Sequence, residues 1–313
     1  MYLKNYCLPF VIIMMAGSFV SCKKNSQTTV VTNAVSVKQV MTQSEDQLRV
    51  VAEIDNLTID ANIAIESSGV FSGRAQNVLG NLCNAETMTD TSGTTKKLTI
   101  TYNGLNCAGN RFYQGIVVLS MPKGIRWKDA GAVLSINKQD LKITRIKDSS
   151  SITLNGTTLI TNVTGGRLTE LAYNGPITYS LTSNGLSILF DNGALRSWQL
   201  AQKKVFTYNN GIVMTTTGTH TENGTSDICV WGTNRFGDAF ITAINGPVVV
   251  KQDCNYRVVS GEITHSRLAA TIVVTCGLDI NGATTGCPGT GNYYYKIVWT
   301  DNSNNIKTII LPY

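Results

Sequence analysis

Histidine, serine and lysine side chains supply the bases and nucleophiles of many enzymes, and this chain offers few of them in useful patterns. His220 and His265 lie far apart, and neither belongs to a metal-binding or catalytic motif. Ser-x-x-Lys matches begin at Ser120 and Ser135, but Pro122 interrupts the first and no partner motif accompanies either. These residues therefore predict no nucleophile, metal site or cofactor site.

Paired carboxylates are the remaining arrangement that could hydrolyse a cell-wall polymer or polysaccharide. Asp129, Asp140, Glu170 and Asp238 are candidates from distant strands, and a glycosidase needs two carboxylates about 5–9.5 Å apart. The sequence leaves these distances open, so it identifies no catalytic residue, which favours a non-enzymatic protein.

Aromatic side chains could bind sugars by stacking. In a strand, Tyr293 and Tyr295 would share one face while Tyr294 takes the other, so at least one face is expected in the core. Core or cross-strand packing is therefore the favoured interpretation for the aromatic residues considered, which are Trp127, Trp198, Trp231, Trp299 and Tyr293–Tyr295.

The amino terminus carries the clearest chemical signal. Lys4 precedes the apolar run Leu8–Gly17, which is too short for a membrane span of about 20 residues but fits a signal peptide. Ser21-Cys22 ends this segment and resembles the lipobox of bacterial lipoproteins, in which the cysteine thiol is acylated. The resemblance implies a signal peptide over 1–21 and a palmitate-bearing Cys22, and durable anchoring follows from several acyl chains.

The residues after Cys22 indicate in which membrane the protein would be anchored. Lys23-Lys24-Asn25 lacks the Asp that resembles an inner-membrane retention signal, and it lacks the acidic cluster that resembles a surface-export signal. The expected location is the outer membrane, facing the periplasm. Charged residues make up 15% of the chain and the net charge is +6, without a basic stripe, so no nucleic-acid partner is expected.

A flexible linker over 22–42 and a helix over about 44–66 are predicted next. Ser44 and Gln47 have capping-box spacing, and Leu48, Val51 and Ile54 begin an apolar stripe at helical spacing. From about residue 95 the pattern changes to alternating Thr-, Val- and Ile-rich runs. We expect a mainly β fold, in which antiparallel sandwich or meander sheets follow this one helix, in two units over 43–175 and 176–313.

Asn-Gly pairs punctuate the β-rich part, and this dipeptide is a strong hairpin signal because both residues tolerate positive φ. Nine pairs predict a series of antiparallel hairpins, and they begin at Asn103, Asn155, Asn174, Asn184, Asn192, Asn210, Asn223, Asn245 and Asn281.

Six cysteines remain after Cys7 and Cys22, and an even number in an exported protein predicts disulfides. A weak internal repeat places Cys83 and Cys107 around one strand, as Cys254 and Cys287 surround another. The repeat therefore predicts Cys83–Cys107 and Cys254–Cys287 bridges. Cys229 and Cys276 are left to form a third.

Two segments resemble uncharacterised Bacteroidota-type cell-envelope lipoproteins. One is Leu98–Cys107 with Trp127–Gly131, and the other is Gly232–Asp238 with Val259–Glu262. Cys229 and Cys276 depart from that pattern. The resemblance implies an all-β envelope protein without an assigned activity.

Two functions are therefore expected to compete. The first is a membrane-anchored, non-enzymatic envelope lipoprotein that binds a protein partner or a glycan, or has a structural role. The alternative is a polysaccharide or cell-wall hydrolase that uses a carboxylate pair.

Overall fold

The computed structural model describes residues 36–72, 82–266, 270–285, 293–301 and 304–312. All of them belong to one compact unit, Ala34–Tyr313. The expected signal peptide, Cys22 and most of the expected linker lie outside the described residues.

The first element is the long helix α1 (Val37–Ser67), followed by the short helix α2 (Gly69–Ser72). The predicted helix is confirmed, but it begins at Val37 rather than Ser44. Ser36 and Gln39 form the capping box, because the Gln39 N–H donates to Ser36 Oγ at 3.2 Å and the Ser36 N–H donates to Gln39 Oε1 at 2.9 Å. Ser44 is buried, and its hydroxyl donates to the Val40 carbonyl. The first six helical residues were therefore wrongly assigned to the linker.

The rest of the described chain is dominated by one 15-stranded sheet in which every pair is antiparallel. It confirms the expected mainly β, antiparallel fold. The strands are β1 (Ala85–Asp90), β2 (Thr95–Leu105), β3 (Arg111–Pro122), β4 (Ala132–Arg145), β5 (Ser151–Asn162), β6 (Ile177–Phe190), β7 (Leu195–Tyr208), β8 (Ile212–Gly218), β9 (His220–Glu222), β10 (Thr225–Thr233), β11 (Ala239–Lys251), β12 (Arg257–Ser266), β13 (Ile272–Leu278), β14 (Tyr294–Thr300) and β15 (Ile306–Pro312).

Consecutive strands are neighbours along most of the sheet, as in a meander. The exception lies between β7 and β11, where two shorter strands, β8 and β10, both lie. Each of these two pairs with β7 on one side and β11 on the other, β8 along one half of the long strands and β10 along the other half. β5 pairs with β6 across the expected boundary at 175/176. The two expected β units are therefore parts of one sheet.

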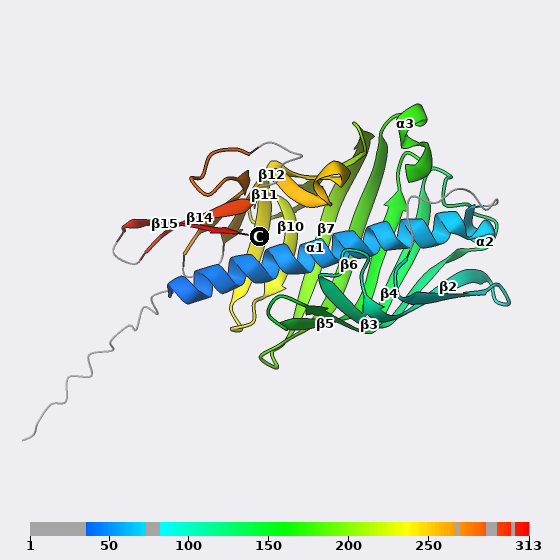
Figure 1. The fold of residues 1–313 in the computed structure, drawn as a ribbon, viewed down its shortest axis with the longest axis horizontal. Coiled ribbons are helices and arrows are strands. Elements are labelled where there is room, and N and C mark those ends of the chain that lie inside the picture. Colours follow the sequence, from blue (N-terminus) through cyan, green and yellow to red (C-terminus); the bar gives the residue numbers. More distant parts are fainter. Residues whose placement is uncertain (1–35, 73–81, 267–269, 286–292, 302–303, 313) are drawn as a thin grey trace, which may run out of the picture. The chain divides into compact units, whose positions relative to one another are not determined.

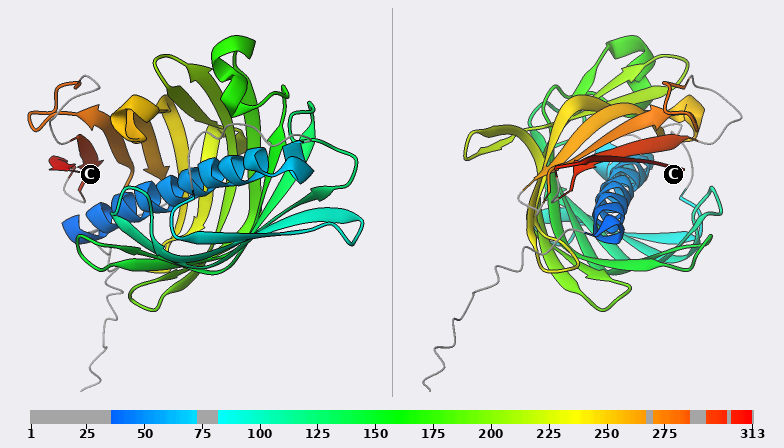
Figure 2. Two further views of the ribbon diagram at one scale, coloured as in Figure 1. Left: turned by 45° about the vertical axis from the view of Figure 1, so that its right-hand side comes forward. Right: turned by 90° about the vertical axis from the view of Figure 1, so that its left-hand side faces the viewer.

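Short helical turns interrupt the connections. The 3-10 turn η1 (Leu168–Glu170) and the one-turn helix α3 (Leu171–Asn174) join β5 to β6, and the 3-10 turn η2 (Gln252–Cys254) joins β11 to β12. Figures 1 and 2 show the sheet curving around α1, so that the helix runs along its concave side.

Asn-Gly pairs account for part of this curvature, and for four of them the hairpin prediction was wrong. The pairs that begin at Asn103, Asn155, Asn184 and Asn245 lie inside strands, and the last three coincide with shifts in strand register. Because a bulge bends its strand and increases the local twist, these pairs help the long strands to curve. Four other pairs, at Asn192, Asn210, Asn223 and Asn281, do lie between strands, and the pair at Asn174 ends α3.

One polar side of α1 faces β2 and β3. Glu53 accepts hydrogen bonds from the Tyr113 hydroxyl at 2.7 Å and from Arg111 Nε at 2.8 Å. Asp60, two turns later, accepts from the Tyr102 hydroxyl at 2.9 Å. These bonds join the helix to the first strands of the sheet.

A second polar side of α1 faces later strands. Asp55 forms an ion pair with Lys204 of β7 at 2.6 Å, and the Lys204 side chain is completely buried. Asn62 Oδ1 accepts from the Trp127 indole at 3.0 Å and from the Tyr179 hydroxyl at 2.8 Å. Since the polar contacts lie on two sides of the helix, they fix both its rotation and its position along the sheet.

Asp46 makes a third connection, near the start of α1. Both of its carboxylate oxygens accept from Arg235, at 2.6 Å each, in the turn between β10 and β11. Arg235 also pairs with Asp191 of the β6–β7 turn and lies 4.7 Å from the centre of the Phe190 ring. One guanidinium therefore joins the helix to two turns of the sheet.

Replacing Lys204 by Met should destabilise the protein by about 3–5 kcal/mol, because it leaves Asp55 as an unpaired buried carboxylate. The double variant D55L/K204M removes both charges and should recover most of that loss. Urea unfolding of the single and double variants checks this. Arg126→Met at the exposed Arg126–Asp129 pair is the control, and it should change stability little because exposed ion pairs contribute little. A double variant as unstable as Lys204→Met would contradict the interpretation.

Candidate functional site

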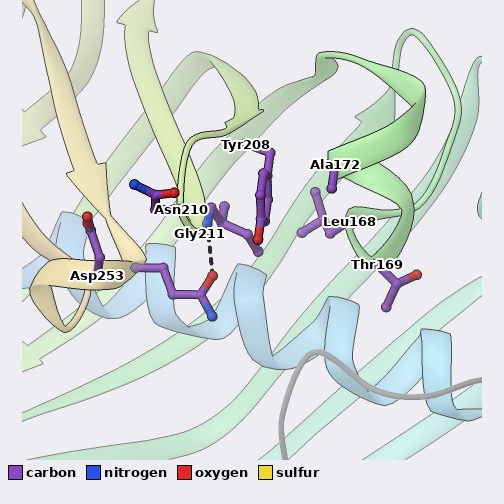
Figure 3. A pocket seen from close by; sticks show the side chains of 9 residues that line it. Leu168, Thr169, Ala172, Tyr208, Asn210, Gly211 and Asp253 are labelled. Atoms are coloured by element: carbon purple, nitrogen blue, oxygen red, sulfur yellow. Dashed lines mark hydrogen bonds between the residues drawn. The ribbon is translucent and has the colours of Figure 1, made fainter.

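The candidate site is a pocket of about 430 Å³ between the η1–α3 turn on one side and the β7–β8 turn with η2 on the other. In Figure 3, Tyr208 lies between Leu168 and Ala172 on one side and Asn210 and Asp253 on the other. The volume lies within the range of small-molecule sites, about 300–1,000 Å³. Thr169, Gly211, Ile212 and Gln252 complete the lining.

One wall of the pocket is fixed by a contact between η2 and the start of β8. Gln252 Oε1 accepts a hydrogen bond from the Ile212 N–H at 2.8 Å, as Figure 3 shows. Gly211 has a φ of +142°, and a Cβ there would lie 3.3 Å from the Gln252 side chain. Glycine is therefore the residue that suits both the backbone conformation and this close approach.

The opposite wall is held by the end of α1. Glu66 is buried and accepts a hydrogen bond from the Leu168 N–H at 2.9 Å. Burial raises the pKa of Glu66, while the hydrogen bond from the Leu168 N–H opposes that shift. Both Leu168 and Thr169 line the pocket, so α1 positions one side of it.

The four expected carboxylates are each held by groups in their own neighbourhood. Asp129 accepts from the Arg126 N–H, and Glu170 pairs with Arg167, both three residues away. Asp140 lies in β4 and accepts from the Asn155 amide of β5, and Asp238 accepts from Asn234 in the β10–β11 turn. None of the four lines the pocket, and Asp253 is the one carboxylate among the lining residues that the structure describes.

Two other carboxylates, both on α1, bind neighbouring tyrosines of the sheet. Glu53 and Asp60 are two turns apart on the helix, and the tyrosines that bind them have ring centres 5.5 Å apart. The Glu53 side chain is only 1% exposed, beneath the sheet. This pair was missed at the sequence level because its spacing matches an ordinary buried helix face.

Burial raises the pKa of Asp60 from 3.8 to about 6; the Tyr102 hydrogen bond opposes the shift and nearby Glu53 adds to it. Between these values the folded state binds more protons than the unfolded state, so the free energy of unfolding falls as pH rises. Asp60→Asn should remove this contribution, about 2–3 kcal/mol between pH 4 and 7.

Urea unfolding of the wild type and Asp60→Asn at several pH values from 4 to 7.5 checks this difference. Asp129→Asn is a suitable control, because hydrogen bonding from the Arg126 N–H lowers the pKa of Asp129. In this variant the free energy of unfolding should still fall as pH rises, as in the wild type. Parallel pH curves for wild type and Asp60→Asn would show that Asp60 titrates normally.

The two histidines do not form a site. His265 is buried in β12, with Nδ1 2.9 Å from Thr242 Oγ1, and burial lowers its pKa to about 3. His220 of β9 stacks on Trp231, with ring centres 4.2 Å apart. In the described ranges, no three His, Cys, Asp or Glu side chains are grouped to hold a metal ion.

Most of the aromatic residues considered belong to the core, as the sequence favoured. Tyr293 and Tyr295 are buried and Tyr294 is half-buried, so the expected alternation is confirmed. The buried tryptophans are Trp127, Trp198 and Trp299, whereas Trp231 is half-buried. The exposed aromatic ring at the pocket is Tyr208, which was not singled out from the sequence.

The Cys83–Cys107 disulfide is confirmed, with an S–S distance of 2.03 Å. It links the two ends of the β1–β2 hairpin. Cys254 is also disulfide-bonded, but its expected partner, Cys287, lies outside the described residues. Cys254 precedes the β12–β13 hairpin as Cys83 precedes β1–β2, which agrees with the repeat used to predict these pairs.

The expected Cys229–Cys276 bond is wrong, because both residues are buried thiols. Cys229 lies in β10 and Cys276 in β13, with β11 and β12 between them. Neighbouring strands are about 4.8 Å apart, so three such steps exceed the roughly 7 Å limit between Cα atoms of a disulfide. Burial raises the pKa of Cys229 to about 12, which makes it an unreactive thiol.

Sequence patterns gave little indication of which residues would line the pocket. Asn210-Gly211 was expected to form a turn, and it lies in one, but nothing in the local sequence indicated that η1 and η2 would face it.

Among the described residues, no helix combines the length and apolar character needed to cross a membrane. No protein-family model, curated protein or solved structure shows significant similarity to this chain.

Proposed function

We propose that this chain is a lipid-anchored envelope protein with a non-enzymatic binding role. It would be tethered through acylated Cys22 to the outer membrane and face the periplasm. The Leu8–Gly17 run and the Ser21-Cys22 junction support the anchor. The Cys83–Cys107 disulfide agrees with an exported protein, because such bonds persist in oxidising compartments. The resemblance to Bacteroidota-type envelope lipoproteins belongs to the same proposal.

The observation that carries the binding role is the pocket beside Tyr208. Its two walls are fixed by hydrogen bonds, from Ile212 to Gln252 and from Leu168 to Glu66. In the part of the lining that the structure describes, it offers an aromatic ring, amides and one carboxylate. A hydrolase would need a second carboxylate or a nucleophile with its base in the same cleft, so the lining fits binding better than hydrolysis.

Cys22→Ser should abolish acylation and release the protein from the membrane fraction. Cells expressing the full chain are labelled with an alkyne palmitate analogue, and membrane and soluble fractions are compared. Cys7→Ser is the matched control, since Cys7 lies within the expected signal peptide and its loss should leave labelling unchanged. Equal labelling of Cys22→Ser and wild type would refute the anchor.

The binding role is tested separately with the purified full chain. A ligand that binds the folded state raises Tm by mass action, so at least one solubilised envelope fraction (protein, lipid or glycan) should raise Tm in thermal unfolding. Tyr208→Ala should reduce that shift. The same Tm in every fraction would refute the binding role.

A further inference from the structure

We infer that the pocket beside Tyr208 binds a neutral, hydroxyl-rich saccharide, such as a short segment of an envelope glycan. This inference rests on the proposed binding role and adds the chemical class of the ligand.

The charge of the lining excludes the most common alternatives for an envelope ligand. The described residues of the lining include no Lys, Arg or His, and Asp253 is the one carboxylate among them. A phosphate group or a uronic acid would therefore find no cation among those residues to bind it. A neutral ligand suits this lining because it needs no counter-charge.

Tyr208 supplies a flat apolar surface at the end of β7. Its side chain is 55% exposed, in contrast to the buried rings of the core. Leu168 and Ala172 lie on one side of it, and Ile212 adds a further apolar contact. The C–H face of a sugar ring can pack on such a surface, while the tyrosine hydroxyl remains available for a hydrogen bond.

Amide and carboxylate groups lie on the other side of the pocket. Gln252 Oε1 is occupied by the Ile212 N–H, which leaves Nε2 as a donor. Asn210 offers both a donor and an acceptor. Sugar hydroxyls donate and accept, so they match this mixture better than a ligand that only donates.

A primary amine is the competing ligand, since Asp253 is a carboxylate of the lining. It would use one carboxylate and leave the Asn210 and Gln252 amides without a matching partner. The Ile212–Gln252 and Leu168–Glu66 bonds hold the walls in place before binding, which reduces the entropy that a ligand must overcome. The structure therefore favours a ligand that contacts both sides of Tyr208 at once.

The test uses the purified full chain in detergent on an array of neutral disaccharides that includes cellobiose, maltose, mannobiose and diacetylchitobiose. Galacturonic acid oligomers and glucosamine are the charged comparisons. At least one neutral sugar should bind, with affinity then measured by titration calorimetry. Tyr208→Ala should weaken that binding about tenfold or more, and Asp253→Asn should keep selectivity for neutral sugars.

Tyr173→Ala is the matched control. Tyr173 is 89% exposed and follows Ala172 directly, but it does not line the pocket, so its loss should leave affinity unchanged. Binding restricted to charged sugars, absence of binding to any neutral sugar, or equal loss in Tyr173→Ala and Tyr208→Ala would overturn the inference. If an envelope fraction still raises Tm in those cases, the binding role stands and only the ligand class is wrong.

Discussion

The burial of charged groups on α1 is the constraint on which the rest of the structure depends. A buried carboxylate needs a partner, and Asp46, Glu53 and Asp55 find theirs in Arg235, Arg111 and Lys204 of the sheet. The partners come from strands and turns far apart in the sequence. An apolar helix could slide or rotate at small cost, whereas this one has a single position in which its charges are paired.

The sheet must curve to bring partners to both sides of one helix. The long strands bend where their register shifts, and three of these shifts contain Asn-Gly pairs. The same dipeptide forms tight turns elsewhere in the chain, so its role depends on its position in the sheet. The pocket follows from this arrangement, because Glu66 at the end of α1 holds Leu168 while η2 approaches from the other side.

Local patterns predicted the elements well and their assembly poorly. Apolar spacing indicated the helix, and alternation indicated the strands. Ser36–Gln39 and Ser44–Gln47 have the same capping pattern, so sequence alone did not decide where α1 begins. The predicted Cys229–Cys276 disulfide was wrong because pairing the two remaining cysteines used no information on the order of the strands. Pocket residues Tyr208 and Asp253 come from separate connections, and their proximity depends on the curvature of the whole sheet.

The distance along the chain between α1 and its partners affects the order of folding. Asp46 and Arg235 are 189 residues apart, so α1 is synthesised long before the strands that neutralise its charges. Contacts between residues far apart in sequence slow folding, because the intervening chain must be ordered first. During that interval the charged side chains of α1 must stay hydrated, because their burial without partners would be unfavourable. Docking of α1 against the sheet is therefore expected to come late in folding.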